Sequence, residues 1–353
     1  MLPASSDAAD QDWENSPKAI GYQQAGALDR VDSLVDIVLE RPVPTGRDIL
    51  VKVEAVSANP VDCKIRSSMS SPEGAWRVLG WDAAGTVEAV GDGVSNFKVG
   101  DAVFYSGSLI RQGANAEYHL VDERIVGRKP THASYVEAAA LPLTAITAWE
   151  MMFDRLNVRS ALPGAANAML IIGGAGGVGS IAIQLARALT DLTVIATASR
   201  PETVEWVKEL GAHHVIDHRQ PLAEQVKALG IGAPAFVFST NETKSQLSEI
   251  IELIAPQGRF GLIDDPDSLD IMGFKRKSVS AHWEFMFTRS MYGTADMGKQ
   301  GELLTAVADL IDEGKIKTTV TEVLRPINAA NLRKAHAVLE SGKAKGKIVL
   351  EGF

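Results

Sequence analysis

Residues 168–187 constrain the fold more than any other stretch of this 353-residue chain. The stretch begins with an apolar run that is typical of a buried strand, and it then places Gly174, Gly176 and Gly179 in the spacing G-x-G-x-x-G. Apolar residues at helical spacing follow over 181–186. A strand, a glycine turn and a helix are therefore predicted in immediate succession.

The glycine spacing has a mechanical reason that predicts a dinucleotide site. The first glycine lets the chain turn sharply out of the strand, and the second lets the backbone approach a pyrophosphate. The third lets the helix pack closely on the sheet, so that its N-terminal N–H groups face the phosphates. We therefore expect the cofactor to contact Gly174, Gly176, Gly177, Val178 and Gly179. The alternative is a merely glycine-rich turn.

Expected strands and helices alternate from residue 168 onward. Such alternation predicts an α/β fold, a Rossmann doubly wound parallel sheet with helices on both faces. The expected strands lie at 168–172, 193–197, 215–216, 235–238, 259–263 and 278–282, and the expected helices begin at 177 and span 201–210, 222–229 and 244–254.

The first part of the chain has a different texture. Short runs rich in β-branched residues, at 49–57, 84–90 and 99–104, are broken by turns and accompanied by little helical signal. This spacing predicts a compact β-barrel-like module. A Rossmann half does not need the last fifty residues, so we expect them to return and complete this module.

A chain of this length is too long for one compact core, so two domains are expected. The predicted division gives a flexible acidic leader at 1–17, a β-rich domain at 18–144 and 301–353, and a dinucleotide-binding domain at 145–300.

Composition excludes several classes of function. A net charge of −9 argues against nucleic acid as the main partner. The single cysteine, Cys63, excludes an internal disulfide and a thiolate zinc cluster. No apolar run is long enough for a membrane span, and the first 17 residues lack the pattern of a signal peptide. We expect a cytoplasmic protein that acts on a small molecule.

The end of the second expected strand predicts which cofactor is bound. An Asp or Glu at this point selects NAD, because it binds the ribose 2′-hydroxyl. Here Ser199 and Arg200 follow the strand without a carboxylate, and a serine hydroxyl with an arginine fork suits a 2′-phosphate. His218 and Arg219, after the next strand, flank the same pocket. We therefore expect NADP (NADPH), the alternative being that Arg200 is only a solvated residue at a helix start.

Seven further segments carry a family pattern. They are VSANPVDCKIR at 56–66, GWDAAGTV at 80–87, FKVGDAV at 97–103, AEYH at 116–119, ALPLTAITAW at 140–149, LGA at 210–212 and GKIVL at 346–350. Together with the glycine loop they resemble the medium-chain dehydrogenase/reductase superfamily, in the order of its quinone oxidoreductase-like branch. Segments 280–289 and 327–332, with Ala335 and His336, are similar to the subgroup called zinc-type alcohol dehydrogenase-like proteins.

This resemblance implies a GroES-like catalytic domain, a Rossmann domain and an active-site cleft between them. It also implies NADPH-linked reduction, often of a quinone or an activated alkene, and a homodimer formed by extending the Rossmann sheet.

The resemblance also bears on a metal site. Zinc-dependent relatives hold the metal with a cysteine, a histidine and a further cysteine or acid. In this chain Asn59 stands in place of the first cysteine and Trp81 in place of the histidine, while Cys63 lies off that register. We therefore expect no zinc. The remaining donors lack ligand spacing: Asp62, Asp82, His119 and Glu150.

Without a metal, hydride transfer needs an acceptor that is already electron-poor, such as a quinone or an enone. We expect Asn59 and Asp62 near the nicotinamide and the substrate oxygen, and Thr147 on the nicotinamide ribose or carboxamide. The alternatives are a turn at Asn59, a local cap at Asp62 and a packing hydroxyl at Thr147. Lys64 replaces a tyrosine common in the branch, and it either donates a hydrogen bond or is solvated.

Two other functions stay open at this point. One is a zinc-dependent alcohol dehydrogenase, and the other is a structural or sensing protein that binds NADPH with little turnover.

Overall fold

The computed structural model describes residues 16–353, which form two compact units. The first unit holds the residues up to Pro142, Phe287–Asp312 and Val320–Phe353, and the second holds Leu143–Met286 and Glu313–Thr319. These divisions fall close to the predicted 144/145 boundary but not to the 300/301 boundary. Most of the expected leader at 1–17 lies outside the described residues.

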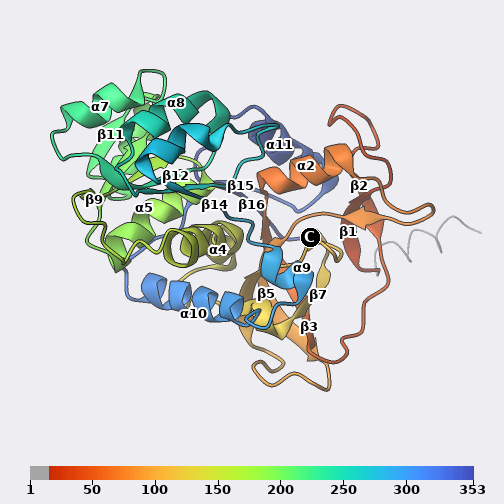
Figure 1. The fold of residues 1–353 in the computed structure, drawn as a ribbon. Coiled ribbons are helices and arrows are strands. Elements are labelled where there is room, and N and C mark those ends of the chain that lie inside the picture. The colour runs from red at the N-terminus through yellow and green to blue at the C-terminus, as the bar shows by residue number, and fades with distance from the viewer. Residues whose placement is uncertain (1–15) are drawn as a thin grey trace, which may run out of the picture. The chain divides into compact units, whose positions relative to one another are not determined.

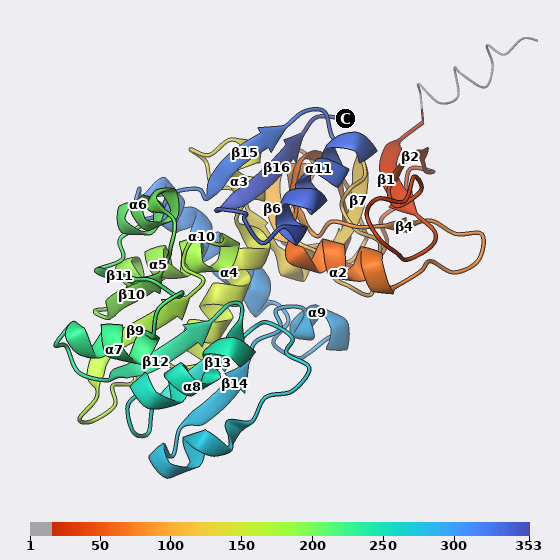
Figure 2. The same ribbon diagram turned by 90° about the horizontal axis from the view of Figure 1, so that it is seen from above.

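The second unit is built on a six-stranded parallel sheet of order β11-β10-β9-β12-β13-β14 (Figure 2). The strands are β9 (Ala166–Ile172), β10 (Thr193–Thr197), β11 (His214–Ile216), β12 (Pro234–Ser239), β13 (Arg259–Leu262) and β14 (Ser280–Trp283). The helices are α4 (Pro142–Trp149), a π-helical turn at Glu150–Arg155, α5 (Gly177–Leu189), α6 (Pro201–Glu209), α7 (Leu222–Ala228), α8 (Thr243–Leu253) and a 3₁₀ turn at Ile271–Lys277. This strand order is that of the Rossmann fold, so the predicted fold class is confirmed.

The alternation of strands and helices is found where the sequence predicts it, because the four central strands, β10, β9, β12 and β13, are apolar runs that the sheet buries. Leu170, Ile195, Val237 and Phe260 come from four neighbouring strands and lie together in one fully buried core. Parallel strands covered on both faces require such continuous apolar runs. Within residues 16–353 no helix combines the length and the apolar character of a membrane span.

The first unit contains a seven-stranded sheet, mostly antiparallel, in which β16 pairs with β3 and β3 pairs with β5 and β7 (Figure 1). Its strands are β3 (Asp48–Ser57), β5 (Asp82–Val90), β6 (Ala102–Ser106), β7 (Tyr118–Asp122), β8 (Val126–Arg128), β15 (Val320–Leu324) and β16 (Lys347–Glu351). A smaller sheet consists of β1 (Lys18–Tyr22), β2 (Val35–Val38) and β4 (Arg77–Val78). The α-helices of this unit are α2 (Pro60–Ser68), α3 (Tyr135–Ala139), α9 (Thr288–Tyr292), α10 (Lys299–Asp312) and α11 (Ala329–Glu340).

Helix α2 is not expected from the sequence pattern. Local signals for it exist, because Asn59 is the N-cap, Pro60 occupies the first turn, and Asp62 accepts the Asn59 N–H (2.7 Å). What is missing is an apolar stripe, since α2 buries polar side chains instead. Arg66 is 1% exposed, donates to the Gly26 carbonyl (2.7 Å) and pairs with Glu340 of α11.

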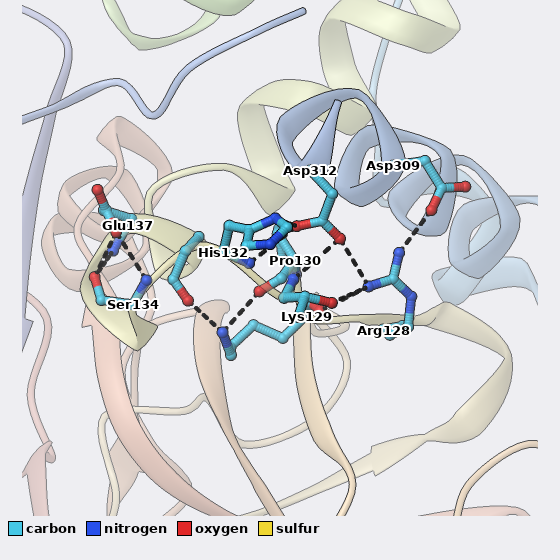
Figure 3. A network of polar contacts seen from close by, with 10 residues as sticks. Arg128, Lys129, Pro130, His132, Ser134, Glu137, Asp309 and Asp312 are labelled. Carbon is cyan, nitrogen blue, oxygen red and sulfur yellow. Dashed lines mark hydrogen bonds and ion pairs between the residues drawn. The ribbon is translucent and has the colours of Figure 1, made fainter. Parts of the chain in front are cut away.

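A polar network fixes the loop after β8 to the end of α10 (Figure 3). The Asp312 carboxylate accepts the N–H groups of Thr131 (3.1 Å) and His132 (3.0 Å), and it pairs with Arg128 (3.1 Å). Partial burial alone would raise the pKa of Asp312, but these N–H groups and the guanidinium lower it to about 2. The network therefore holds residues 128–132 against the C-terminal end of α10, which is followed in the chain by Glu313–Thr319.

Candidate functional site

The glycine loop of the second unit joins β9 to α5, as the sequence predicts. Helix α5 begins at Gly177 with Gly176 as its N-cap, and neither a side-chain cap nor an acidic residue is found in its first turn. The first N–H groups of a helix have no partner inside the helix, and the helix dipole gives this end a partial positive charge. The start of α5 therefore suits an anion such as a pyrophosphate.

The three motif glycines differ in what their missing side chains would meet. A Cβ at Gly174 would lie 2.9 Å from the Cβ of Ala196, and one at Gly179 would lie 2.3 Å from the carbonyl oxygen of Gly173. These two glycines are required by the protein's own packing. A Cβ at Gly176 would meet only the Gly173 oxygen, at an ordinary 3.5 Å. The space beside Gly176 is thus left open by the protein, which fits the close approach of a phosphate.

The residues expected at the adenosine ribose follow β10 and β11, which are neighbours in the sheet. The backbone oxygen of Ser199 accepts a hydrogen bond from Nη2 of Arg219 (3.0 Å). Arg219 also forms an ion pair with Asp217 (2.8 Å), which compensates that carboxylate. The structure therefore places Arg219 directly against Ser199.

The other two predicted residues of this group are less closely tied to Ser199. The Arg200 guanidinium lies 3.2 Å from the Glu202 carboxylate, and Arg200 is the N-cap of α6. The His218 side chain is exposed, and its backbone carbonyl accepts from Gln246 (3.1 Å). Two arginines thus follow β10 and β11, where a 2′-phosphate is expected, and each is paired with a neighbouring carboxylate.

In the first unit, Asn59 and Asp62 lie with Asp82 and Lys347 in a buried polar group, which we call the Lys347 cluster. Asn59 and Asp62 come from the start of α2, Asp82 from the start of β5 and Lys347 from the start of β16. Exposed fractions are 1% for Asn59 and Asp62, 0% for Asp82 and 3% for Lys347. In the sequence, Lys347 stands out only as part of the GKIVL family motif, which predicts no role for it.

Hydrogen bonds within the cluster use every N–H of its two donor side chains. The Lys347 ammonium donates to the Ala58 carbonyl (3.1 Å) and to Oδ1 of Asn59, and also to Oδ2 of Asp82 (3.1 Å). The Asn59 amide nitrogen donates to the Ser57 carbonyl (3.2 Å) and to Oδ2 of Asp82 (2.8 Å). An amide nitrogen has only two hydrogens, so Asn59 has no N–H left for a substrate oxygen.

Asp62 is the member of the cluster with an unsatisfied atom. Its Oδ2 accepts the backbone N–H of Asn59 (2.7 Å), but its buried Oδ1 has no hydrogen-bond partner. Burial, with a smaller contribution from Asp82, raises the pKa of Asp62 to about 7, although the Asn59 and Gly80 N–H groups and the Lys347 ammonium oppose this shift. Asp62 therefore changes its charge near neutral pH.

Asp62→Asn is expected to remove a pH dependence from folding stability. The unfolded carboxyl ionises near pH 4 and the folded one near pH 7, so wild-type stability falls as pH rises between these values. The asparagine oxygen still accepts the Asn59 N–H and carries no charge. Urea unfolding should show the variant gaining on the wild type between pH 5 and pH 8, by on the order of 2–4 kcal/mol. Parallel pH profiles would contradict the raised pKa.

The hydroxyl of Thr147 has a hydrogen bond within its own helix, and the side chain of Lys64 is in contact with solvent. Thr147 lies on α4 in the second unit, where its hydroxyl donates to the Leu143 carbonyl (2.7 Å). The hydroxyl oxygen keeps its acceptor capacity. Lys64 is exposed on α2.

The donor chemistry of the first unit does not fit zinc. The Trp81 indole N–H donates to the Ser108 carbonyl (3.0 Å), and an indole is not a metal ligand. Burial, with the nearby Asp62 and Glu340 carboxylates, raises the pKa of the Cys63 thiol to about 12, which disfavours the thiolate that zinc binds. Over the described range, 16–353, no three side chains of His, Cys, Asp or Glu are grouped as a metal site requires.

Two family models match parts of the chain. The alcohol dehydrogenase GroES-like domain matches residues 45–146, and the zinc-binding dehydrogenase model matches residues 210–350.

Similar proteins cover almost the whole chain. A zinc-type alcohol dehydrogenase-like protein of Staphylococcus aureus (strain MSSA476) is 42% identical over 335 residues, which is 94% of this chain and 99% of the relative. A chloroplast envelope quinone oxidoreductase homolog of Arabidopsis thaliana is 29% identical, over 88% of this chain and 91% of that protein. A protein from Rhizobium etli CFN 42, provisionally named a zinc-dependent alcohol dehydrogenase protein, has a crystal structure that matches with a TM-score of 0.95 and 64% sequence identity. The match covers 96% of this chain and 99% of that chain.

Proposed function

Because this chain belongs to the zinc-type alcohol dehydrogenase-like proteins of the medium-chain dehydrogenase/reductase superfamily, we propose that it transfers hydride from NADPH to a quinone or an enone without a metal ion. Members of this superfamily are oxidoreductases that use a nicotinamide cofactor. The observation that carries the proposal is the Lys347 cluster, in which Asn59, at the position of the first zinc-binding cysteine of the family pattern, accepts a hydrogen bond from the Lys347 ammonium. Without a Lewis acid, the acceptor itself must be electron-poor.

The second unit would hold the cofactor. The start of α5 and the open space at Gly176 suit the pyrophosphate. Ser199, Arg200 and Arg219 suit the 2′-phosphate, since guanidinium groups form strong charge-assisted hydrogen bonds with phosphate. When bound, NADPH supplies the hydride, and the protein's part is to bind and orient the cofactor and to exclude water.

Arg200→Ala is expected to weaken NADPH binding by about 1–3 kcal/mol and to spare NADH, because NADH has no 2′-phosphate. Titration of both cofactors, followed by nicotinamide fluorescence, measures the two affinities. Arg276→Ala, an exposed arginine in the 3₁₀ turn of the same unit, is the matched control and should change neither. An equal loss for NADH and NADPH would contradict the 2′-phosphate assignment.

At the reacting end we assign Asn59 a positioning role, since its amide hydrogens are already donated. Asp62, whose Oδ1 has no partner, is assigned to donate a hydrogen bond to the substrate oxygen in its protonated form. Thr147, whose hydroxyl oxygen can still accept a hydrogen bond, is assigned to the nicotinamide carboxamide or ribose.

A substrate panel tests the proposal. NADPH oxidation should be seen with p-quinones and enones, and simple aldehydes and ketones should react far more slowly because they need a Lewis acid. Efficient reduction of simple carbonyls would favour an alcohol dehydrogenase instead. Tight NADPH binding without turnover on any acceptor would favour a structural or sensing protein.

We also propose a homodimer formed at the edge of the Rossmann sheet. Strand β14 is the last strand of that sheet, and Trp283 beside its free edge is 56% exposed. An edge strand offers unpaired N–H and C=O groups to a second copy. Light scattering should give a dimer mass for the wild type and a smaller mass for Ala281→Pro, which removes an edge N–H. A monomeric wild type would contradict the dimer.

A further inference from the structure

The Lys347 cluster resembles a cation-binding site in which the cation is a lysine side chain of the protein itself. Three oxygen atoms surround the Lys347 ammonium: the Ala58 carbonyl oxygen (3.1 Å), Oδ2 of Asp82 (3.1 Å) and Oδ1 of Asn59. The ammonium has three hydrogens, so its hydrogen-bonding capacity is filled. Lys347 and Asp82 are almost completely buried, so their opposite charges attract each other with little screening by water.

Asn59, which stands where zinc-dependent relatives have their first cysteine ligand, takes part in this arrangement. Asn59 presents its oxygen to Lys347 and its nitrogen to Asp82 and to the Ser57 carbonyl, so both polar atoms of the amide already have partners. A divalent cation held by Oδ1 of Asn59 or by Oδ2 of Asp82 would share that atom with the ammonium. Two cations so close together in a buried site repel each other strongly.

We propose that the Lys347 ammonium takes the place of a metal ion in the first unit and closes this cluster to divalent cations. The inference deepens the proposed zinc-independent reaction by naming the residue that excludes the metal. Metal binding is measured without turnover, so failure of the substrate proposal and failure of this one are distinguishable.

The charge balance of the cluster supports this assignment. The positive charge of Lys347 compensates Asp82, and it also acts on Asp62, which is buried on α2. An added divalent cation would leave an excess of positive charge even with both Asp82 and Asp62 ionised, because Lys347 and the cation together carry three positive charges against two negative ones. Replacing Lys347 by a neutral side chain and Asn59 by a carboxylate would reverse this balance.

The decisive comparison is between Asn59→Asp alone and Asn59→Asp combined with Lys347→Met. Each protein is incubated with zinc chloride or cobalt chloride, desalted, and analysed for retained metal and for the visible spectrum of bound cobalt. The double variant is expected to retain stoichiometric metal and to be stabilised by it, while Asn59→Asp alone and the wild type retain none. Equal uptake by both variants, no uptake by the double variant, or stoichiometric uptake by the wild type would overturn the proposal.

A second measurement covers the case in which the double variant does not fold. Lys347→Met leaves room beside Asp82 and Asn59 that a small monovalent cation can enter. Ammonium chloride is expected to raise the melting temperature of Lys347→Met more than tetramethylammonium chloride at the same ionic strength, and to leave the wild type unchanged. Equal effects of the two salts on the variant would overturn the proposal.

Discussion

Replacing Gly176 by valine is expected to weaken NADPH binding at least about 100-fold while the cofactor-free protein stays folded. The backbone at Gly176 is extended (φ −71°, ψ 176°), a conformation that valine adopts without strain. A Cβ there has only an ordinary 3.5 Å contact with the protein. The added side chain would instead occupy the space that the pyrophosphate needs. Fluorescence titration and thermal unfolding of the same samples measure both effects.

Gly179→Val is the control for this prediction, because it places a side chain against the protein itself. Its Cβ would lie 2.3 Å from the Gly173 oxygen and 2.6 Å from the Gly174 Cα, so the loop or the helix must move. This variant should lose both cofactor binding and stability. If Gly176→Val bound NADPH normally, or unfolded as readily as Gly179→Val, the site assignment would be wrong.

Lys347→Met is expected to lower the free energy of unfolding at pH 8 by about 3–5 kcal/mol, the usual cost of breaking a buried ion pair on one side. The variant leaves the Asp82 carboxylate at 0% exposure without its cationic partner. It also leaves the Asn59 oxygen without the hydrogen bond from the ammonium. Urea unfolding followed by tryptophan fluorescence measures the loss.

The double variant Lys347→Met with Asp82→Asn is the matched control. Removing both charges is much less costly than removing one, so this protein should recover most of the stability that Lys347→Met loses. Lys347→Arg keeps the charge and should be closer to the wild type. A loss below about 1 kcal/mol for Lys347→Met would mean that the pair is not the buried anchor described above.

The Rossmann unit was predictable from the sequence because its signals are local. The glycine spacing and the apolar runs each report on neighbouring residues, and β10 is found at its predicted bounds, 193–197. The positions of Ser199 and Arg200 after that strand follow from the same local pattern. The contact between Arg219 and Ser199 is visible only in the structure, because these residues follow two different strands.

The Lys347 cluster could not be predicted in the same way. Lys347 contacts residues 265 to 289 positions away in the chain, so no periodicity records the pairing. Helix α2 was missed because the residues it buries include Asp62 and Arg66, and hydrophobic patterns do not detect buried polar groups. The sequence indicates that Asn59 replaces a metal ligand, but only the structure shows which atoms form hydrogen bonds with its amide group.

The most direct test of zinc-independent hydride transfer is the activity of metal-depleted protein. The wild type is dialysed against a strong chelator, its metal content is measured by elemental analysis, and NADPH oxidation by a p-quinone is followed before and after. We predict no stoichiometric zinc in the purified protein and an unchanged kcat after chelation. Stoichiometric zinc, with activity lost on its removal and restored by adding zinc back, would contradict the account.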